Sequence, residues 1–372
     1  MRLAHVVPRE EQPWSGILTV IVHLTAALRG QGHQVEVWQL HRWDDRYASQ
    51  RRVLEAAEVV EIPVAVDAPA WRVGRIAASL AEKRSIDVVH LHGAFNIWTA
   101  VVGRALRRPY VFSPHSGYDP VSLRRSRLRK TVYGLAFERT LIRRAALLVG
   151  LTEVEVAQLR ARGARGPAVV IPNGVAPAQE GVDPAAFREE VGIPPDAPLA
   201  VFVGRLDVHR KGLDVLVEGI ADAPGWHLAL VGPRFRGVER LEATIRHRDL
   251  GDRVHLVGSR YGHALHQALA GADVFALLSR WEGLPMALLE ALSLGTPAVV
   301  SPAVERLVPV AASGAGWVAD DGRLVDVLRE AASGATARGE AARALASRYD
   351  WDAVAREYGA AYRRARDRFA TA

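Results

Sequence analysis

The sequence predicts an α/β fold made of two doubly wound domains, each built around a parallel sheet. Three observations support this prediction. Short apolar runs alternate with segments of helical periodicity, the alternation starts afresh near residue 180, and 372 residues are enough for two separate cores. Runs that are apolar on both faces are typical of strands in parallel sheets, because helices cover both sides of such a sheet.

Six runs predict strands in the first half of the chain. A strand over residues 2–7 is followed by an amphipathic helix over 17–29, which Gly30 closes because glycine readily ends a helix. The other predicted strands cover residues 35–40, 87–92, 110–113, 146–151 and 168–172, with helical segments between them. We therefore place a first Rossmann-like domain at residues 1–180.

A second series of strands follows the low-complexity connector GVAPAQEG at residues 174–181. Its runs are LAVFVG at 199–204, HLALVG at 227–232, RVHLVG at 253–258, VFALLS at 274–279 and PAVVS at 297–301. We place a second Rossmann-like domain at residues 181–349. Ligands of such sheets bind outside the carboxyl ends of the strands, so the loops after these runs are the candidate site.

Composition limits the classes of function. The formal charge of +7 and the pI near 10.0 favour an anionic partner. The absence of cysteine excludes disulfides and thiolate metal sites. No apolar run approaches the ~20 residues of a membrane-spanning helix, and the N-terminus lacks the apolar core of a signal peptide. We expect a cytoplasmic protein.

Two cationic residues follow the first strand of the second series. Arg205 comes directly after Gly204, and Lys211, one of only three lysines in the chain, precedes Gly212 where the next helix begins. A strand end beside a helix N-terminus favours an anion, because the helix dipole and the free amides both attract negative charge. Solvated loop charges are the alternative, but this placement indicates a diphosphate site.

Two acidic residues lie in the mainly apolar segment 279–301. Glu282 is in the loop after a strand, Pro285 suits a first helical turn, and Glu290 falls inside the helix that follows. An ionised carboxylate among apolar residues requires a partner. At ~1.5 Å per helical residue the two acids lie up to ~12 Å apart, which suits two ends of one extended ligand rich in hydroxyls.

Three motifs together resemble glycosyltransferase family 4. They are GRLDxxxKGLD at 204–214, EGLPMALLEALSLGTP at 282–297 and IPNGV at 171–175. The resemblance extends over essentially the whole chain and implies the GT-B fold, in which two Rossmann-like domains face each other across a cleft. It also implies transfer with retention of anomeric configuration and a C-terminal helix, here residues 350–369, that packs back on the N-terminal domain.

The resemblance implies a role for each donor-side residue. Arg205 and Lys211 would hold the diphosphate of a nucleotide sugar, Glu282 would face the donor sugar, and Glu290 would bind the ribose hydroxyls. Pro285 has no N–H, so only its neighbours can donate backbone hydrogen bonds. The remaining implied donor-binding residues are Gly16, Gly283, Leu284 and Met286; Ser15 stands where the family has a first glycine.

The N-terminal domain is expected to bind the acceptor. His115, in the segment 112–120 after a strand, corresponds to the family's histidine near the donor sugar, and Tyr118 lies in the same segment. His90 and His92 are expected to point to opposite faces of their strand, which would prevent them from sharing a metal ion. We expect His90 to be packed inside and His92 to line the cleft.

Two further features leave alternatives open. The basic stretch from Arg124 to Lys130 is either a solvated helix face or a surface for an anionic acceptor or an acidic membrane. Nucleic acid is not expected, because no aromatic residues are interleaved as stacking platforms. Asp350 and Asp352 resemble the D-x-D metal signature of another glycosyltransferase class, but a helix cap is the better interpretation.

The resulting prediction is a metal-independent retaining glycosyltransferase without a cofactor. It would transfer a sugar from a UDP- or GDP-type donor to a glycan, lipid-linked or small-molecule acceptor, with possible peripheral contact at the inner face of the membrane. His115, Arg205, Lys211 and Glu282 are the predicted catalytic residues, and His92, His115 and Tyr118 are placed on the acceptor side. The alternatives are a nucleotide-sugar epimerase, a phosphorylase, or a non-catalytic nucleotide-sugar-binding protein of the same fold.

Overall fold

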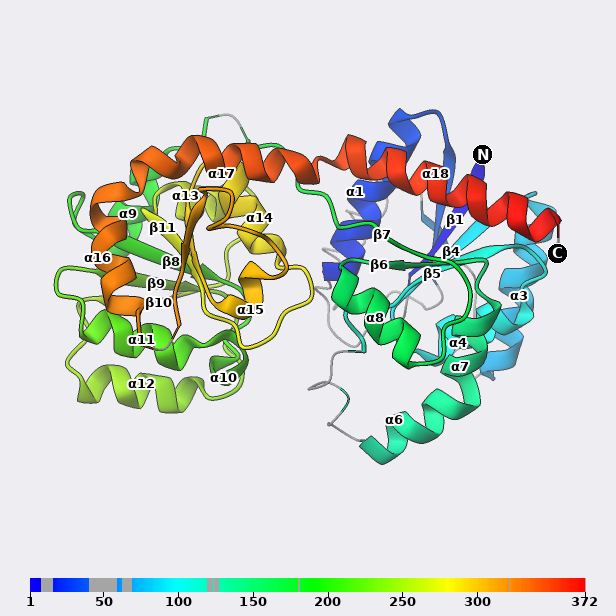
Figure 1. The fold of residues 1–372 in the computed structure, drawn as a ribbon, viewed down its shortest axis with the longest axis horizontal. Coiled ribbons are helices and arrows are strands. Elements are labelled where there is room, and N and C mark those ends of the chain that lie inside the picture. The colour runs from blue at the N-terminus through cyan, green and yellow to red at the C-terminus, as the bar shows by residue number, and fades with distance from the viewer. Residues whose placement is uncertain are drawn as a thin grey trace. The chain divides into compact units, whose positions relative to one another are not determined.

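The computed structural model describes residues 1–7, 16–39, 59–61, 69–118, 123, 127–179, 181–320 and 322–371. These residues form two units, and each unit has its own parallel sheet (Figure 1). One unit comprises Met1–Gly174 together with Trp351–Ala372, and the other comprises Val175–Asp350. The boundary in the structure thus follows Gly174, slightly before the boundary at residue 180 that the sequence predicts.

The described part of the first unit contains a seven-stranded sheet in the order β3-β2-β1-β4-β5-β6-β7. Every neighbouring pair is parallel, and β1 pairs with β2 on one side and with β4 on the other. The winding therefore reverses at β1, which makes the β1–β4 edge the topological switch point. In chain order the elements are β1 (Arg2–Val7), α1 (Gly16–Gly30), β2 (Gln34–Gln39), β3 (Val59–Glu61), α3 (Ala70–Lys83), β4 (Val88–His92), α4 (Ile97–Ala105), β5 (Tyr110–Ser113), α6 (Arg127–Tyr133), a π-helical turn (Gly134–Glu138), α7 (Arg139–Arg144), β6 (Leu147–Gly150), α8 (Glu153–Ala161), β7 (Ala168–Val170) and α18 (Trp351–Ala370).

Separate clusters of buried apolar side chains cover the two faces of this sheet. Ala4 of β1 belongs to the cluster with α3, α4 and α7, whereas its neighbour Leu3 belongs to the cluster with α1 and α18. Successive residues of a strand point to opposite faces, so an apolar run of this kind is buried on both sides.

The C-terminal helix α18 belongs to the first unit and packs against α1 (Figure 1). It buries Trp351, Val354, Tyr358 and Tyr362 at helical spacing, while arginines occupy its exposed face. Burial of each large apolar side chain contributes about 1.5–3 kcal/mol, so this stripe anchors the end of the chain to the N-terminal sheet.

The two passages of the chain between the units lie beside each other. The amide of Val175 donates to the carbonyl of Tyr349 at 2.7 Å, and Val175 and Asp350 form a parallel bridge. Gly174 allows Trp351 to pack here, because a Cβ at position 174 would lie 2.3 Å from the indole ring. The IPNGV motif thus includes the glycine on which the start of α18 rests.

The described part of the second unit contains a six-stranded parallel sheet in the order β10-β9-β8-β11-β12-β13. Its winding reverses at β8, which pairs with both β9 and β11. The elements are α9 (Pro184–Val191), β8 (Leu199–Val203), α10 (Val208–Lys211), α11 (Leu213–Ala221), β9 (His227–Val231), α12 (Val238–His247), β10 (Val254–Gly258), α13 (His263–Ala270), β11 (Val274–Leu277), α14 (Met286–Ser293), β12 (Ala298–Val300), α15 (Pro302–Glu305), β13 (Gly316–Val318), α16 (Leu324–Gly334) and α17 (Gly339–Ala346).

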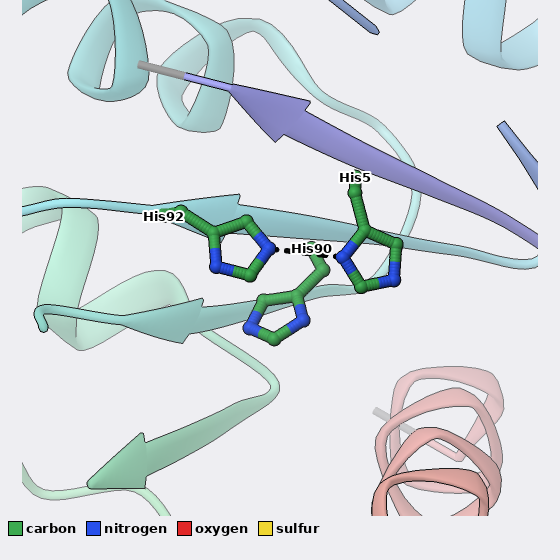
Figure 2. A group of neighbouring side chains, drawn as sticks. All are labelled: His5, His90 and His92. Carbon is green, nitrogen blue, oxygen red and sulfur yellow. Dashed lines mark hydrogen bonds between the residues drawn. The ribbon is translucent and has the colours of Figure 1, made fainter. Parts of the chain in front are cut away.

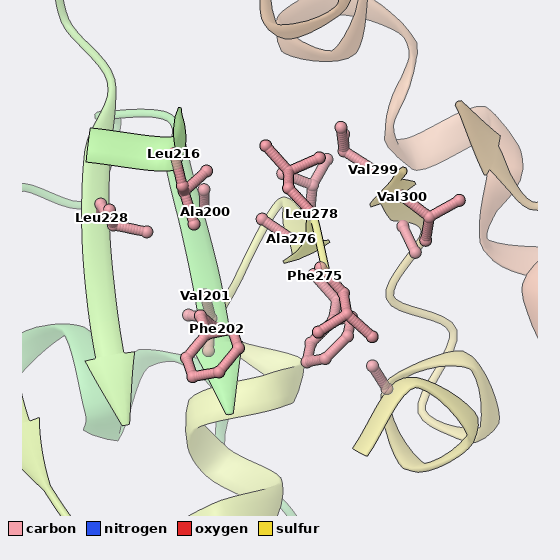
Figure 3. Packing of buried hydrophobic residues seen from close by; sticks show 14 of the residues in the cluster. Ala200, Val201, Phe202, Leu216, Leu228, Phe275, Ala276, Leu278, Val299 and Val300 are labelled. Atoms are coloured by element: carbon pink, nitrogen blue, oxygen red, sulfur yellow. The ribbon is translucent and has the colours of Figure 1, made fainter. Parts of the chain in front are cut away.

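One large apolar core holds the second unit together. Phe202 of β8, Phe275 of β11 and Leu216 of α11 are fully or almost fully buried in it, with Val299 of β12 across the sheet (Figure 3). These residues come from the runs that the sequence identified as strands. The core therefore fixes the carboxyl ends of β8 and β11, where the site lies.

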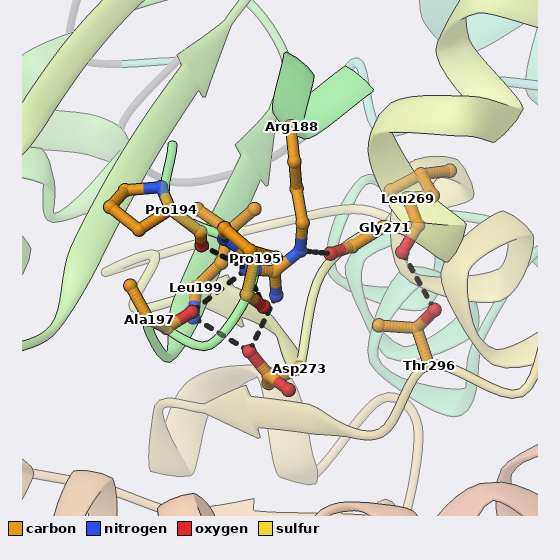
Figure 4. A network of polar contacts seen from close by, with 9 residues as sticks. All are labelled: Arg188, Pro194, Pro195, Ala197, Leu199, Leu269, Gly271, Asp273 and Thr296. Carbon is orange, nitrogen blue, oxygen red and sulfur yellow. Dashed lines mark hydrogen bonds and ion pairs between the residues drawn. The ribbon is translucent and has the colours of Figure 1, made fainter. Parts of the chain in front are cut away.

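A polar network ties the other end of this sheet together (Figure 4). The Arg188 guanidinium donates to the carbonyls of Gly271 and Ala197, both at 2.8 Å, and pairs with the Asp273 carboxylate at 2.9 Å. Asp273 also accepts from the Leu199 amide at 2.7 Å. The planar guanidinium thus links α9 to the starts of β8 and β11.

These observations confirm the predicted fold of two doubly wound parallel sheets, and the short strands β3 and β13 add to those found from sequence. β13 is the three-residue run GWV within a stretch of glycine and alanine, which is too short to show a period. Among the described residues, no helix combines the length and the apolar character that crossing a membrane requires.

Candidate active site

The loops after β8 and β11 meet at the switch point of the second unit. α10, which follows β8, lies against the segment 278–285, which follows β11, and the Arg280 amide donates to the Arg210 carbonyl at 2.9 Å. Ligands of doubly wound sheets bind at this position. The motifs around Lys211 and Glu282, 71 residues apart in the chain, are therefore neighbours in space.

Gly212 makes this close approach possible. Its φ of 66° is in the left-handed region, and it ends α10 one residue before α11 begins. A Cβ at this position would lie 2.1 Å from the carbonyl oxygen of Leu278. Both its conformation and its contact thus require glycine. Lys211 is the last residue of α10, a separate short helix that was not distinguished from α11 in the sequence.

Glu282 forms the centre of the donor-side network. Its carboxylate pairs with the Lys211 ammonium, lies 3.6 Å from the Arg210 guanidinium, and accepts from the Ser279 hydroxyl at 2.6 Å. The Glu282 side chain is 5% exposed and that of Lys211 18%. Two cations thus surround one carboxylate, which leaves net positive charge at the switch point. Arg210 was not predicted as a site residue from the sequence, although it stands next to Lys211.

Arg280 and Ser301 brace the segment that holds Glu282. Arg280 forms two bonds to the Asp214 carboxylate, each 2.9 Å, and donates to the His209 carbonyl at 2.6 Å. The Ser301 hydroxyl donates to the Ser279 carbonyl at 2.6 Å. These contacts join the loops after β8, β11 and β12, so the position of Glu282 is supported from both sides.

Arg205 lies at the carboxyl end of β8. Its guanidinium stands 5.2 Å from the centre of the Phe235 ring, and the residue is exposed. Such stacking orients the guanidinium beside the loop that follows β8.

The other donor-side residues lie at the start of α14. Gly283 and Leu284 follow Glu282, Pro285 takes the N-cap position, and Met286 is the first helical residue. Pro285 provides no side-chain hydrogen bond to the first amides of the helix. Helix starts of this kind present backbone donors to an anion or a hydroxyl.

Glu290 lies in α14 between buried leucines and alanine. Within the described ranges of the chain, its carboxylate has neither a hydrogen-bond donor nor a cation beside it. Burial raises its pKa from 4.5 to about 7. Among the residues that the structure describes, none thus serves as a partner for this carboxylate.

Three histidines gather at the switch point of the first unit (Figure 2). His5 is on β1, and His90 and His92 are on β4; all three are buried. The expectation that His90 and His92 point to opposite faces was wrong. Residues two apart in a strand share a face, and the two rings lie 3.9 Å apart between centres. His92 is fully buried, contrary to the expectation that it lines a cleft.

His115 adjoins this cluster from the segment after β5. Its Nε2 lies 2.8 Å from Nδ1 of His92, and its backbone φ is 50°. Ser116 also has a positive φ, 62°, and its amide donates to the buried Glu155 carboxylate. Two successive left-handed residues without glycine are unfavourable, and such strain is concentrated at functional sites. Burial lowers the pKa of His115 to about 4.

Tyr118 lies in the core of the first unit, where it is 1% exposed. Its hydroxyl donates to the buried Glu138 carboxylate at 2.5 Å, and the Phe95 amide donates to the same carboxylate at 3.1 Å. The Arg162 guanidinium lies 5.6 Å from the Tyr118 ring. These contacts indicate that Tyr118 stabilises the core of the first unit. Its placement on the acceptor side stays a prediction.

The remaining candidates are placed as follows. Gly16 begins α1 directly after the segment 8–15, and Ser15 falls in that segment, outside the described residues. Residues 124–126 of the basic stretch also fall outside them.

A surface hollow of about 480 Å³ runs along α3, and none of the predicted site residues lines it. Asp350, with extended backbone, immediately precedes α18, as a helix cap would.

Comparison with known proteins identifies the class of protein to which this chain belongs. Residues 14–179 match the family model described as Glycosyltransferase Family 4, and residues 183–347 match the one described as Glycosyl transferases group 1. Their order follows the two units of the structure.

Individual relatives cover most of the chain. A GDP-mannose:cellobiosyl-diphosphopolyprenol alpha-mannosyltransferase from Xanthomonas campestris is 28% identical over 288 residues, which is 74% of this chain and 73% of that protein. A D-inositol 3-phosphate glycosyltransferase from Jonesia denitrificans is 30% identical over 258 residues, which is 62% of this chain and 59% of that protein. The HepE protein of Anabaena, solved in complex with UDP, matches with a TM-score of 0.78 at 19% identity and covers 97% of this chain and 99% of that one.

The two doubly wound sheets and the cationic switch point, together with these matches, define a glycosyltransferase of the GT-B fold. The chain belongs to the glycosyltransferase family 4 type. The class and the family predicted from the three sequence motifs are thus confirmed.

Proposed function

We propose that this glycosyltransferase retains the anomeric configuration and uses no metal ion. The bond between the anomeric carbon and the diphosphate oxygen breaks, and a bond to the acceptor oxygen forms on the same face of the sugar. The acceptor proton passes to the leaving diphosphate. The observation that carries the proposal is the grouping of Lys211 and Arg210 around Glu282 at the switch point.

The cationic side chains act on the leaving group. Negative charge grows on the diphosphate as the glycosidic bond breaks, and preorganised cations stabilise that charge in the transition state. Lys211 and Arg205 bind the diphosphate, and Arg210 adds a third positive charge beside them. This supply of protein charge takes the place that a divalent ion has in other transferases.

Glu282 orients the reacting groups. In the structure it holds the Lys211 ammonium, and Ser279 fixes one of its oxygens. When a donor binds, the Glu282 carboxylate accepts hydrogen bonds from the sugar hydroxyls. The amides of Gly283, Leu284 and Met286 then bind the sugar and phosphate oxygens. His115 accepts a hydrogen bond from the sugar that is transferred.

Glu290 binds the ribose of the nucleotide. Two ribose hydroxyls would supply the donors that the carboxylate lacks, and a charge-assisted hydrogen bond contributes about 1.5–3 kcal/mol. Donor binding would then favour the ionised carboxylate and offset its burial.

The acceptor carries phosphate. Both relatives described above are named for phosphorylated acceptors, a diphosphopolyprenol-linked sugar and inositol 3-phosphate. The net charge of +7 is suited to an anionic acceptor of that kind. Uridine and guanosine diphosphate sugars are the donors to test first, since HepE was solved with UDP and the Xanthomonas relative is named for GDP-mannose.

A donor and acceptor screen tests the reaction. The purified chain is incubated with UDP-, GDP- and ADP-sugars and with phosphorylated acceptors in excess EDTA, and both nucleotide release and product mass are followed. We expect release that depends on acceptor and is unaffected by EDTA, with an α-linked product from an α-linked donor. Loss of turnover in EDTA would contradict metal independence, and an inverted product would contradict retention.

The same screen separates the rival functions. An epimerase would return an altered nucleotide sugar without an acceptor-linked product. A phosphorylase would require phosphate as a reactant and release a sugar phosphate. A non-catalytic protein would bind the nucleotide sugar and release no nucleotide with any acceptor.

Substitution of Lys211 tests the assigned machinery. Lys211→Ala should lower kcat/KM by ~10²-fold or more, because one charge-stabilising group is lost. Lys83→Ala is the matched control, since it removes the same charge from the exposed end of α3. Circular dichroism and thermal melting verify that both variants fold. Equal kinetics for the two variants would remove Lys211 from the site.

We also infer that the region of α6 contacts an anionic membrane surface. Leu128, Val132 and Leu135 are 78%, 60% and 65% exposed on α6 and the π-helical turn, and the exposed Arg139 follows them. Exposed apolar residues beside basic ones are typical of helices that lie in the interface of anionic bilayers. A lipid-linked acceptor would be reached from that position.

Vesicle sedimentation tests this contact. The chain should bind phosphatidylglycerol vesicles and not phosphatidylcholine vesicles, and the double variant Leu128→Ser/Leu135→Ser should lose most of the binding. Val154→Ser, which changes an exposed apolar residue on α8, is the control. Equal binding by all three proteins would refute the assignment to α6.

A further inference from the structure

We propose that a chain of hydrogen bonds through buried side chains sets the tautomer of His115, with Tyr362 of α18 as a positioning residue. The inference rests on the proposed function, in which His115 accepts a hydrogen bond from the transferred sugar. We call this set of residues the histidine chain; in order its members are Ser113, His90, Tyr362, His5, His92 and His115.

The links of the histidine chain are continuous. Nε2 of His90 lies 2.8 Å from the Ser113 hydroxyl, and its Nδ1 lies 2.8 Å from the Tyr362 hydroxyl. The same hydroxyl lies 3.4 Å from Nε2 of His5, whose Nδ1 lies 3.0 Å from Nε2 of His92 (Figure 2). Nδ1 of His92 then lies 2.8 Å from Nε2 of His115. Residues from β1, β4, β5 and α18 thus form one path that ends at His115.

The imidazoles of the chain are neutral at neutral pH. Burial lowers the pKa of His5 to about 3 and that of His115 to about 4, and it lowers those of His90 and His92 well below the ordinary value. The Arg29 charge acts in the same direction on His5. A neutral imidazole donates through one nitrogen and accepts through the other. The tautomers along the chain are therefore coupled, and only two complete arrangements exist.

The Tyr362 hydroxyl decides between the two arrangements, because it has a single proton. Its 2.8 Å link to His90 has the usual length of a strong bond donated by a hydroxyl, whereas its 3.4 Å link to His5 is long. Tyr362 therefore donates to His90 and accepts from Nε2–H of His5. His92 then donates to His5, and His115 donates to His92 through Nε2–H. This leaves Nδ1 of His115 as the acceptor for a ligand.

The same histidines are close enough to suggest a metal site, and the geometry disfavours it. Ligand nitrogens of His5, His90 and His92 lie within 4.8 Å of one another. However, the rings of His90 and His92 lie only 3.9 Å apart between their centres and are tilted by 34° to each other. Every ring nitrogen already has a hydrogen-bond partner, and the charge acting on His5 is that of Arg29, a cation.

Nuclear magnetic resonance tests the proposal without any substrate. The full chain is labelled with ¹⁵N-histidine, two-bond ¹H–¹⁵N correlations report which nitrogen of each ring holds the proton, and His115→Asn assigns the His115 signals. We expect His115 to hold its proton on Nε2 at pH 7. In Tyr362→Phe, which removes the deciding proton, the signals of His5, His92 and His115 should shift to a mixture of tautomers.

Turnover gives the second measurement. Tyr362→Phe should lower kcat about tenfold with little change in KM for the donor, as loss of positioning would. Tyr110→Phe, which removes a buried hydroxyl that donates to the Leu141 carbonyl and is not a link of the chain, should retain the wild-type His115 pattern and rate. A proton on Nδ1 of His115, or an unchanged pattern in Tyr362→Phe, would overturn the proposal.

Two outcomes separate this inference from the proposed function. If the tautomer pattern is as expected while His115→Asn turns over normally, the histidine chain stands and the catalytic role of His115 fails. Stoichiometric Zn²⁺, found by elemental analysis of untagged protein, would replace the hydrogen-bonded chain by a metal site and overturn the proposal.

Discussion

Substitution of Glu290, whose carboxylate has no partner among the described residues, should make the protein more stable and a weaker binder of nucleotide. Burial raises the pKa of this carboxyl from 4.5 to about 7. The folded state therefore holds a proton that the unfolded chain releases between these values. This contribution to stability is fully present below about pH 4.5 and is lost as the pH rises through about 7.

The size of the effect follows from that rise in pKa. At ~1.36 kcal/mol for each pKa unit, the ionised Glu290 lowers the free energy of unfolding by up to about 3 kcal/mol at pH 8.5. Glu290→Gln removes the ionisation while keeping the shape. Its advantage over wild type should therefore be small at pH 4.5 and grow to about 3 kcal/mol at pH 8.5, or up to about 10 °C in Tm.

Nucleotide binding should respond in the opposite direction. If the ribose hydroxyls donate to the ionised carboxylate, wild-type affinity for UDP or GDP should rise about tenfold between pH 6 and pH 8, as the competent fraction rises. Glu290→Gln should lose this dependence and bind about 10- to 100-fold more weakly at pH 8.

Thermal melting, urea unfolding and isothermal titration calorimetry measure both effects. Glu330→Gln, which changes an exposed carboxylate on α16, is the matched control and should alter neither. A stability difference that does not change with pH would refute the account of burial. Normal nucleotide binding by Glu290→Gln would refute the ribose assignment.

Two predictions concern the framework of the second unit. Gly212→Ala should destabilise the fold by more than about 2 kcal/mol and abolish turnover, because it combines a left-handed φ with a clash against Leu278. Gly225→Ala is the control: its backbone φ is 82° and no atom lies near the added Cβ, so urea unfolding of this variant measures the cost of the left-handed φ alone. Equal losses would exclude the clash. Arg188→Lys should cost about 2 kcal/mol in the same measurement, because a lysine cannot reach Gly271, Ala197 and Asp273 together, and an unchanged midpoint would contradict that reasoning.

Much of the fold could be predicted from the chain because its strands are buried on both faces. Runs such as LAVFVG and VFALLS are apolar throughout, so their type is clear without knowledge of their neighbours. The short strands β3 and β13 lacked enough residues to show a period. The expectation for His90 and His92 was wrong for a simpler reason: their spacing of two already places both on one face.

Residue types in the sequence indicate candidates for a donor site, but they do not indicate the contacts among those residues. Arg205, Lys211, Glu282 and Glu290 stand in motifs whose residue types indicate a diphosphate and hydroxyl ligand. That Glu282 pairs with Lys211, and that Arg210 joins them, depends on β8 and β11 being adjacent in the sheet. Strand order is a property of the folded sheet that local patterns do not contain.

The sequence by itself determined the class of this protein, through two series of buried strands and the motifs that follow them. Only the tertiary structure decided that His5, His92 and Tyr362 form one hydrogen-bonded chain with His115. Tyr362 lies 357 residues from His5, and α18 returns to the first unit by packing its apolar stripe on α1. Contacts of that range arise from burial of whole surfaces, so they are set by packing and are not encoded in any local pattern.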